Sequence, residues 1–466
     1  MEPRSPSAMV RWLLPDLSLL LAGVTLFYAL LLYQAPTQLF RDSDAGWHIR
    51  NGERILASGA VPTVDPWSFS KPGEPWFAWE WGADVLMARA HQSFGLRGVA
   101  LLYLALIGLC SWLWMRLHWT TGGTFGLAAV FAAPFLTSVQ LHWLARPHVF
   151  SWVFLLLALY WVERGKYVWL VPLAVFWANF HGSFILLPAL LVCYAARDWR
   201  CLLWAGGTLA ATVLNPYGWG VHVHIWHYLQ NKELLDRVAE FQSFNFHSEG
   251  AGQIILALLL VMGGAVCALQ AGRWHHALWM FGLVVMSLRS ARGLPILALA
   301  GLPMANAAIS GAMAGRWPVV FAYFGRLRGW DARVHGTALA VPALALFALA
   351  VLGTPALFPD RQFPTAAMAH VPVEARLLAP DSYGGYLIYQ GRSVYFDGRS
   401  DYYGAAFLQE YVKLVEVRPG FRQILAKYGF THALLPVRYS LVEVLRESGW
   451  RERYRDEVSV LLERNF

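Results

Sequence analysis

The chain has 466 residues, of which 57% are hydrophobic and only 14% are charged. Soluble domains carry about 25% charged residues, so this composition excludes an ordinary soluble protein and predicts a polytopic α-helical membrane protein. The net charge is +8, but the basic residues are spread over short segments between apolar runs. That spread argues against a nucleic-acid partner, which would need a continuous basic face.

Apolar runs in the sequence mark the membrane helices, since about 20 mostly apolar residues cross a bilayer. We predict about 11 transmembrane helices, the first of them retained and not cleaved as a signal peptide. Their approximate limits are 12–34, 98–115, 123–141, 148–162, 167–181, 183–196, 201–214, 252–271, 275–288, 293–312 and 337–357. Residues 1–357 thus form a transmembrane domain.

The basic residues between these runs set the expected orientation. They alternate so as to share one side, which the positive-inside rule makes cytoplasmic. They are Arg4, Arg11, Arg116, Arg164, Lys166, Arg197, Arg200, Arg273, Arg316, Arg326, Arg328 and Arg333. We therefore expect a multi-pass protein of the bacterial inner membrane with a cytoplasmic N-terminus. The large first loop (35–97, with short helices) and everything after residue 357 then lie on the outer, periplasmic side.

A dense group of charged residues opens the first outer loop, in the stretch RDSDAGWHIRNGERIL (41–56). Within it Asp42, Asp44, His48 and Glu53 follow directly on a membrane helix. Ionisable residues near a membrane are costly and often mark a substrate pathway. The spacing from Asp44 to His48 and Arg50 favours Asp44 over Asp42 as the central acid.

Other unusual polar residues belong to the same predicted face. Each of them alone has an equally good structural explanation, but together they suit an anionic substrate handled by a general base. They are Arg146, His148, Asn179, His181, Tyr217, Glu240, Arg289 and Arg292. The stretch HVHIWH (222–227) also offers three histidines, but no accompanying carboxylate pattern supports a metal site there.

Residues 358–466 differ in kind, because charged residues are about twice as dense there as in the rest of the chain. GGYLIYQG, SVYFDGR and HALLPV resemble short buried strands, whereas FLQEYVKLVEV, FRQILAKYG and LVEVLRESG have helical spacing. We predict a small soluble C-terminal α/β domain on the outer, periplasmic face.

These features together resemble the GT-C superfamily of polyprenyl-phosphate-sugar-dependent membrane glycosyltransferases. The local match is to the catalytic subunits of oligosaccharyltransferases, whose first-loop Asp is followed by a His or Tyr two residues before an Arg. Here that pattern is Asp44-Ala-Gly-Trp47-His48-Ile-Arg50. A set of uncharacterised bacterial GT-C-like proteins is similar along nearly the whole chain, with DxDxxWH, RPH, NxHG, NPYG and GGYL…DGRxDxYG in the same order.

The resemblance implies transfer of a sugar from a polyprenyl-phosphate-linked donor to an acceptor glycan, lipid or protein in the cell envelope. Asp44 is then the expected general base, with Asp42 second and His48 orienting the acid. Arg146, Arg289 and Arg292 are expected to neutralise the leaving phosphate. Substrate-binding roles are further expected for Glu53, His148, Asn179, His181, Tyr217 and Glu240.

The sequence also departs from the oligosaccharyltransferases. Their second acidic pair is missing, since the next outer loop reads QLHWLARPH. A divalent metal, magnesium or manganese on Asp42 and Asp44, is therefore left open, because two carboxylates are few for such an ion. The acceptor-reading WWDYG motif is absent too. The segment 382–404 stands in a comparable place and offers Tyr383, Asp397, Arg399 and Asp401, although simple packing explains it equally well.

Two other functions fit the sequence. A transporter or flippase of a lipid-linked saccharide would need ionisable residues at mid-membrane and on both faces, whereas here they gather on one. A non-catalytic GT-C-scaffold subunit of an envelope glycan assembly pathway would explain the missing acidic pair.

Overall fold

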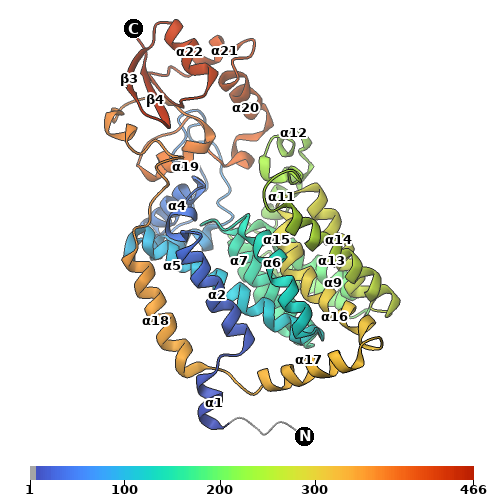
Figure 1. Cartoon of the computed structure of the whole chain (residues 1–466). Coiled ribbons are helices and arrows are strands. Elements are labelled where there is room, and N and C mark those ends of the chain that lie inside the picture. Colours follow the sequence, from blue (N-terminus) through green and yellow to red (C-terminus); the bar gives the residue numbers. More distant parts are fainter. Residues whose placement is uncertain (1–6, 466) are drawn as a thin grey trace.

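The computed structural model describes residues 7–465, so Arg4 lies outside the described part of the chain. Each of the predicted spans coincides with a helix. These helices are α2 (Leu17–Leu31), α5 (Trp81–Thr121), α6 (Phe125–Gln140), α7 (His148–Glu163), α8 (Leu170–Phe180), α9 (Leu186–Tyr194), α10 (Cys201–Ala211), α13 (Ala251–Gln270), α14 (Trp274–Arg289), the run from α15 (Gly293–Ile296) to α16 (Leu302–Ala314), and α18 (Thr337–Gly353). They form the bundle in the lower half of Figure 1.

Four stretches of the described residues are long and apolar enough to cross a membrane: Met9–Leu31, Trp81–Thr121, Ala251–Gln270 and Gly293–Ala314. The other apolar helices are shorter. Large apolar side chains on the bundle are exposed, among them Phe27, Leu259 and Leu346. Such a surface suits contact with lipid, so a helical membrane protein is confirmed, whereas the number of eleven spans stays a prediction.

The helix α5 is much longer than the predicted span because it begins within residues 35–97, the segment predicted as the first outer loop. Phe94 and Gly95 interrupt it with non-helical backbone, Gly95 having φ 61°. The part before this kink packs on α4 (Asp44–Ser58), the short helix that carries the DxDxxWH motif. The kink thus sets α4 beside the end of the bundle, where α4 lies between the bundle and the C-terminal residues (Figure 1).

The last part of the chain contains a four-stranded sheet. Its strands are β1 (Leu377–Leu378), β2 (His432–Pro436), β3 (Arg451–Arg455) and β4 (Ser459–Glu463), in the order β1-β2-β4-β3. β1 and β2 are parallel and the other pairs antiparallel. The accompanying helices are α19 (Asp381–Tyr389), α20 (Ser400–Val415), α21 (Phe421–Lys427) and α22 (Ser440–Glu447).

Three segments differ from the sequence-based expectation. SVYFDGR, expected as a strand, forms only an isolated bridge between Val394 and Ser68. GGYLIYQG, expected as a strand, forms most of α19, because its apolar side chains are buried while both glycines face neighbouring backbone. A further helix, α17 (Pro318–Asp331), lies in the arginine-rich segment between two spans and runs across the far end of the bundle (Figure 1). Its charge hid it from a search for apolar runs.

The remaining short helices are α1 (Ala8–Leu13), α3 (Ala35–Gln38), α11 (Gly220–Gln230) and α12 (Lys232–Leu235). α11 and α12 belong to the long segment between α10 and α13, and α12 contacts α20. This segment closes one side of the space between the bundle and the C-terminal residues.

Candidate active site

A cavity of about 1020 Å³ lies where α4, the start of α7, the segment around Glu240 and the start of α20 meet. Eleven of the residues singled out from the sequence line it, although they come from six separate parts of the chain. They are Asp42, Asp44, Arg146, His148, His181, Glu240, Arg289, Arg292, Asp397, Arg399 and Asp401. One side is charged, and the other is apolar, with Ile185, Leu186, Ile225, Leu229, Met286 and Ile296.

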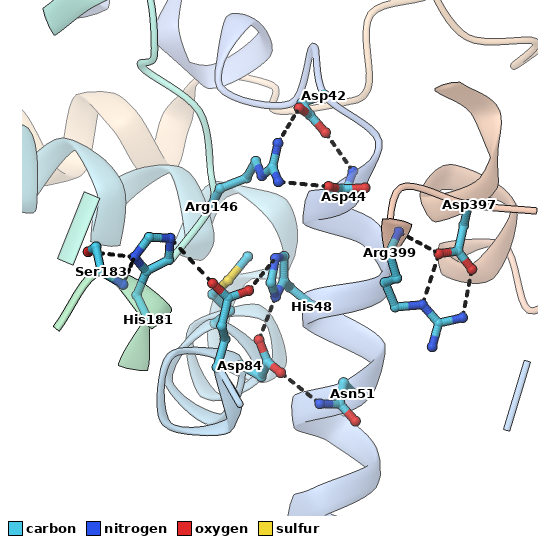
Figure 2. Close-up of polar contacts among 12 residues, drawn as sticks. Asp42, Asp44, His48, Asn51, Asp84, Arg146, His181, Ser183, Asp397 and Arg399 are labelled. Atoms are coloured by element: carbon cyan, nitrogen blue, oxygen red, sulfur yellow. Dashed lines mark hydrogen bonds and ion pairs between the residues drawn. The ribbon is translucent and has the colours of Figure 1, made fainter. Parts of the chain in front are cut away.

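The centre of the charged side is the guanidinium of Arg146. It binds the carboxylates of Asp42 at 3.0 Å, Asp44 at 3.0 Å and Glu240 at 2.7 Å. Figure 2 shows the pairs with Asp42 and Asp44. Arg292 forms a second ion pair with Glu240. Three acids from the first loop and the α12–α13 segment thus converge on a single cation.

Arg146 is held by a tightly bonded turn between α6 and α7. Arg41 donates hydrogen bonds to the carbonyl oxygens of Trp143 and Leu141, at 2.8 and 2.9 Å. His148 bonds the carbonyl of His142 at 2.8 Å through its Nε2. These bonds fix the backbone on both sides of Arg146, so its guanidinium is presented in a set position.

Asp44 combines a salt bridge with burial, its side chain being only 7% exposed. Burial raises the pKa of Asp44 to about 7, against the opposing effect of Arg146 and with a further increase from Asp42. A carboxyl group with a pKa near neutral pH is well suited to accept a proton from a substrate. Glu240 shows the opposite balance: burial alone would raise its pKa, but Arg146 and Arg292 hold it below the usual value.

A chain of polar groups adjoins the cavity, whose lining includes Glu80, Asp84 and His181. Figure 2 shows the part of this chain formed by His48, Asp84 and Asn51. His48 Nδ1 bonds Asp84 at 2.6 Å, and the second oxygen of Asp84 accepts a hydrogen bond of 2.6 Å from Asn51. His48 Nε2 lies 3.7 Å from Glu80, whose other oxygen is 3.4 Å from His181 Nε2. His48, expected in the catalytic centre, is fully buried and bonds Asp84 rather than Asp44.

The electrostatics of this chain follow from its burial. Burial raises the pKa of Glu80 well above the usual value, with a contribution from Asp84. Burial, assisted by Arg146, lowers the pKa of His48 well below its usual value. Both shifts favour the neutral form of the group, and Glu80 lies at the cavity wall.

Arg399 forms a buried ionic centre on the other side of α4. It binds Asp397 through two nitrogens, at 2.9 and 2.6 Å, and Asp65 at 2.6 Å. Its guanidinium also lies within 4.8–5.9 Å of four aromatic rings, those of Trp47, Trp67, Trp76 and Tyr402. Although it reaches the cavity wall, its charge is used to join the first loop to the C-terminal residues.

Glycines of the C-terminal segment allow it to pack directly on α4. A Cβ on Gly385 would lie 2.2 Å from the carbonyl oxygen of Ser43, and one on Gly398 would lie 2.1 Å from a carboxylate oxygen of Asp44. The GGYL and DGR motifs thus hold the backbone against the start of α4. This packing buries the Asp44 carboxylate.

Four of the expected binding residues do not line the cavity. Glu53 pairs with Arg50 and His91, and Tyr383 is buried within the C-terminal residues. Asn179 accepts a hydrogen bond of 2.8 Å from the Trp81 indole, and the Tyr217 hydroxyl accepts one of 2.8 Å from the backbone of Ala78. The last two thereby fix the segment that carries Glu80.

The charged residues Glu80, Asp84 and Arg237 line the cavity but were not singled out from the sequence. The acids lie in FAWEWGAD, where carboxylates stand among tryptophans in a predicted outer loop, and that contrast was an available signal. Arg237 and Arg289 are exposed to the cavity. Neither has an ion-pair partner among residues 7–465.

Metal-ligand geometry occurs elsewhere in the described residues, at Glu163, His275 and His276. This group lies at the end of α7 opposite His148, where Glu163 bonds His276 at 2.6 Å. The histidines of HVHIWH do not converge: His222 bonds Thr212, and His224 bonds Asp401. Asp42 and Asp44, at which the sequence left a metal open, both bind Arg146.

No family model and no curated protein matches the sequence. Among solved structures, the archaeal oligosaccharyltransferase AglB from Archaeoglobus fulgidus, in complex with an inhibitory peptide and a dolichol-phosphate, matches with a TM-score of 0.60. The match covers 90% of this chain and 69% of that one at 12% identity. An oligosaccharyltransferase from Archaeoglobus fulgidus tethered with an acceptor peptide containing the NVT sequon matches with a TM-score of 0.59. The match covers 90% of this chain and 68% of that one at 11% identity. Its complex with Zn and sulfate gives 0.54 over 90% and 68%, at 13% identity.

The chain therefore shares the fold of these archaeal oligosaccharyltransferase structures. This confirms the resemblance read from the sequence at the level of the fold.

Proposed function

We propose that the protein is a glycosyltransferase that moves a sugar from a polyprenyl-phosphate-linked donor to an acceptor at the outer, periplasmic face of the bacterial inner membrane. The observation that carries this proposal is the buried Asp44 carboxylate beside Arg146 in a cavity with one charged and one apolar side. Such a cavity suits a ligand that is itself half charged and half lipid.

The charged side supports a place for the donor phosphate. Arg237, Arg289 and Arg292 line the cavity, and Arg292 stacks on Phe241 with its guanidinium 4.4 Å from the ring. Arginine binds phosphate oxygens by charge-assisted hydrogen bonds. The apolar residues Ile225, Leu229 and Met286 would take the first part of the lipid chain.

The chemistry follows from these placements. Asp44 accepts the proton of the acceptor's nucleophilic group, which attacks the anomeric carbon of the donor sugar. The new glycosidic bond forms as the bond from that carbon to the phosphate oxygen breaks. The electron pair leaves with the lipid phosphate, whose charge the arginines stabilise. The acceptor is a glycan, a lipid or a protein.

The direct test is to incubate the purified full chain with polyprenyl-phosphate sugars and candidate acceptors, and to measure release of the lipid phosphate together with glycosylated product. We expect both in equal amounts. If no donor is consumed, whatever its sugar and lipid length, the result would favour a non-catalytic subunit. Movement of intact donor across vesicles without cleavage would instead identify a flippase.

A further inference from the structure

The acids of the cavity converge as the ligands of a metal would, but on an arginine. Asp42, Asp44 and Glu240 lie 2.7–3.0 Å from the nitrogens of the Arg146 guanidinium. A divalent ion of the magnesium or calcium kind would need their oxygens at about 2.0–2.6 Å around one point. The guanidinium fills that point. These residues therefore do not fit a divalent ion while Arg146 is present.

We infer that Arg146 replaces a divalent cation in this site, so that the protein works without a metal at Asp42, Asp44 and Glu240. The guanidinium supplies a permanent positive charge and donors in fixed directions, and it holds three acids apart that would otherwise repel one another. The role of Arg146 in catalysis rests on the proposed function, whereas the effect of Arg146 on metal binding does not.

The surroundings of Arg146 indicate that the fold holds this residue in place. The turn from Leu141 to Arg146 is tied to the start of the first loop by two bonds from Arg41 and by the bond from the Ala145 amide to the carbonyl of Leu39, at 2.8 Å. The Arg146 side chain is only 18% exposed. The loop QLHWLARPH contains Arg146 and no acid, and the fold brings this arginine to three carboxylates from other segments.

The charge balance of the group agrees with this inference. Asp42, Asp44 and Glu240 carry up to three negative charges, and Arg146 with Arg292 returns two positive ones. Removing Arg146 would leave an uncompensated acidic cluster, which is the chemistry that attracts a hard divalent cation.

The test is a titration of the purified full chain with Mn²⁺, followed by electron paramagnetic resonance, for wild type, Arg146→Ala and Arg146→Gln. We expect no stoichiometric binding at these acids in the wild type. Each Arg146 variant should bind one Mn²⁺ per chain, at least about tenfold more tightly than any residual Mn²⁺ binding by the wild type. Adding Asp44→Asn should remove the gained site. Arg292→Ala is the matched control: it also frees Glu240 but leaves Arg146, and it should gain no site.

Two results would overturn the inference: one Mn²⁺ bound to the wild type and lost in Asp44→Asn, or folded Arg146 variants that gain no binding. Folding of the variants is checked by circular dichroism and thermal unfolding. If the variants do not fold, the wild-type titration still decides. The transfer activity of the wild type after EDTA treatment is an independent measurement, and we expect EDTA to cause no loss of activity. Absent transfer in all samples would contradict the proposed function alone, since the Mn²⁺ results do not depend on it.

Discussion

The carboxylate of Asp44 and the guanidinium of Arg146 form an ion pair of 3.0 Å that joins α4 to the turn before α7. The two residues are about a hundred positions apart in the sequence, and the pair is closed on its other side by Gly398. This arrangement gives Asp44 a defined direction and an altered proton affinity. Several measurable consequences depend on it.

The transfer rate should depend on pH through Asp44. Because burial raises the pKa of Asp44 to about 7, the carboxyl is mostly protonated below that pH and ionised above it. A general base works only when ionised, so kcat/KM should rise as the pH increases through about 7. A rate that is constant from about pH 5 to pH 9 would contradict this role for Asp44.

The glycine contact between α19 and α4 should be required for the site. In Gly385→Ala the new Cβ would meet the carbonyl of Ser43 at 2.2 Å, so the start of α4 must move. We expect a loss of stability of about 1–3 kcal/mol and a fall in transfer. Thermal unfolding in detergent measures the first effect. Gly353→Ala, where nothing lies within 4 Å of the new Cβ, is the control, and equal unfolding temperatures for the two variants would refute the contact's importance.

Arg399 should matter for stability more than for chemistry. Arg399→Ala leaves Asp65 and Asp397 buried without their shared cation, which costs about 3–5 kcal/mol. Arg446→Ala removes a surface arginine that is 46% exposed and should change stability by less than about 0.5 kcal/mol. Denaturation curves of both variants compare the two costs. Similar curves would show that the buried centre does not hold the first loop.

Arg289 should act on donor binding. Its guanidinium lines the cavity and has no ion-pair partner among the described residues, so it is free to bind a phosphate. Arg289→Ala should raise KM for the lipid-phosphate donor about tenfold or more, the cost of one charge-assisted hydrogen bond. Arg326→Ala, at the opposite end of the bundle, should leave KM unchanged. An unchanged KM in Arg289→Ala would remove this residue from the donor site.

Part of this structure was predictable from the sequence. The apolar runs gave the helices of the bundle, because burial in lipid or protein leaves a strong pattern. Asp44, Arg146, Glu240 and Arg292 were recognisable as ionisable residues on one face. Their mutual pairing was not, since nothing in their spacing shows which acid meets which arginine.

The other differences have similar causes. His48 lies one turn after Asp44 on α4, which suggested a joint role, but its ring points to Asp84 on α5. Glu80 was hidden in a segment rich in tryptophan, and nothing in the sequence shows its contact with the distant His181. α19 was expected as a strand because local preference favoured one. Packing against α4 decides its conformation.

The most direct test of the central claim is the rate of sugar transfer by Asp44→Asn. The substitution keeps the size of the side chain but removes the base, so transfer should fall by about 100-fold or more. Asp198→Asn, on the segment between α9 and α10, is the matched control and should retain the wild-type rate. Full activity in Asp44→Asn, with lipid phosphate released as in wild type, would contradict the assignment of Asp44 as the general base.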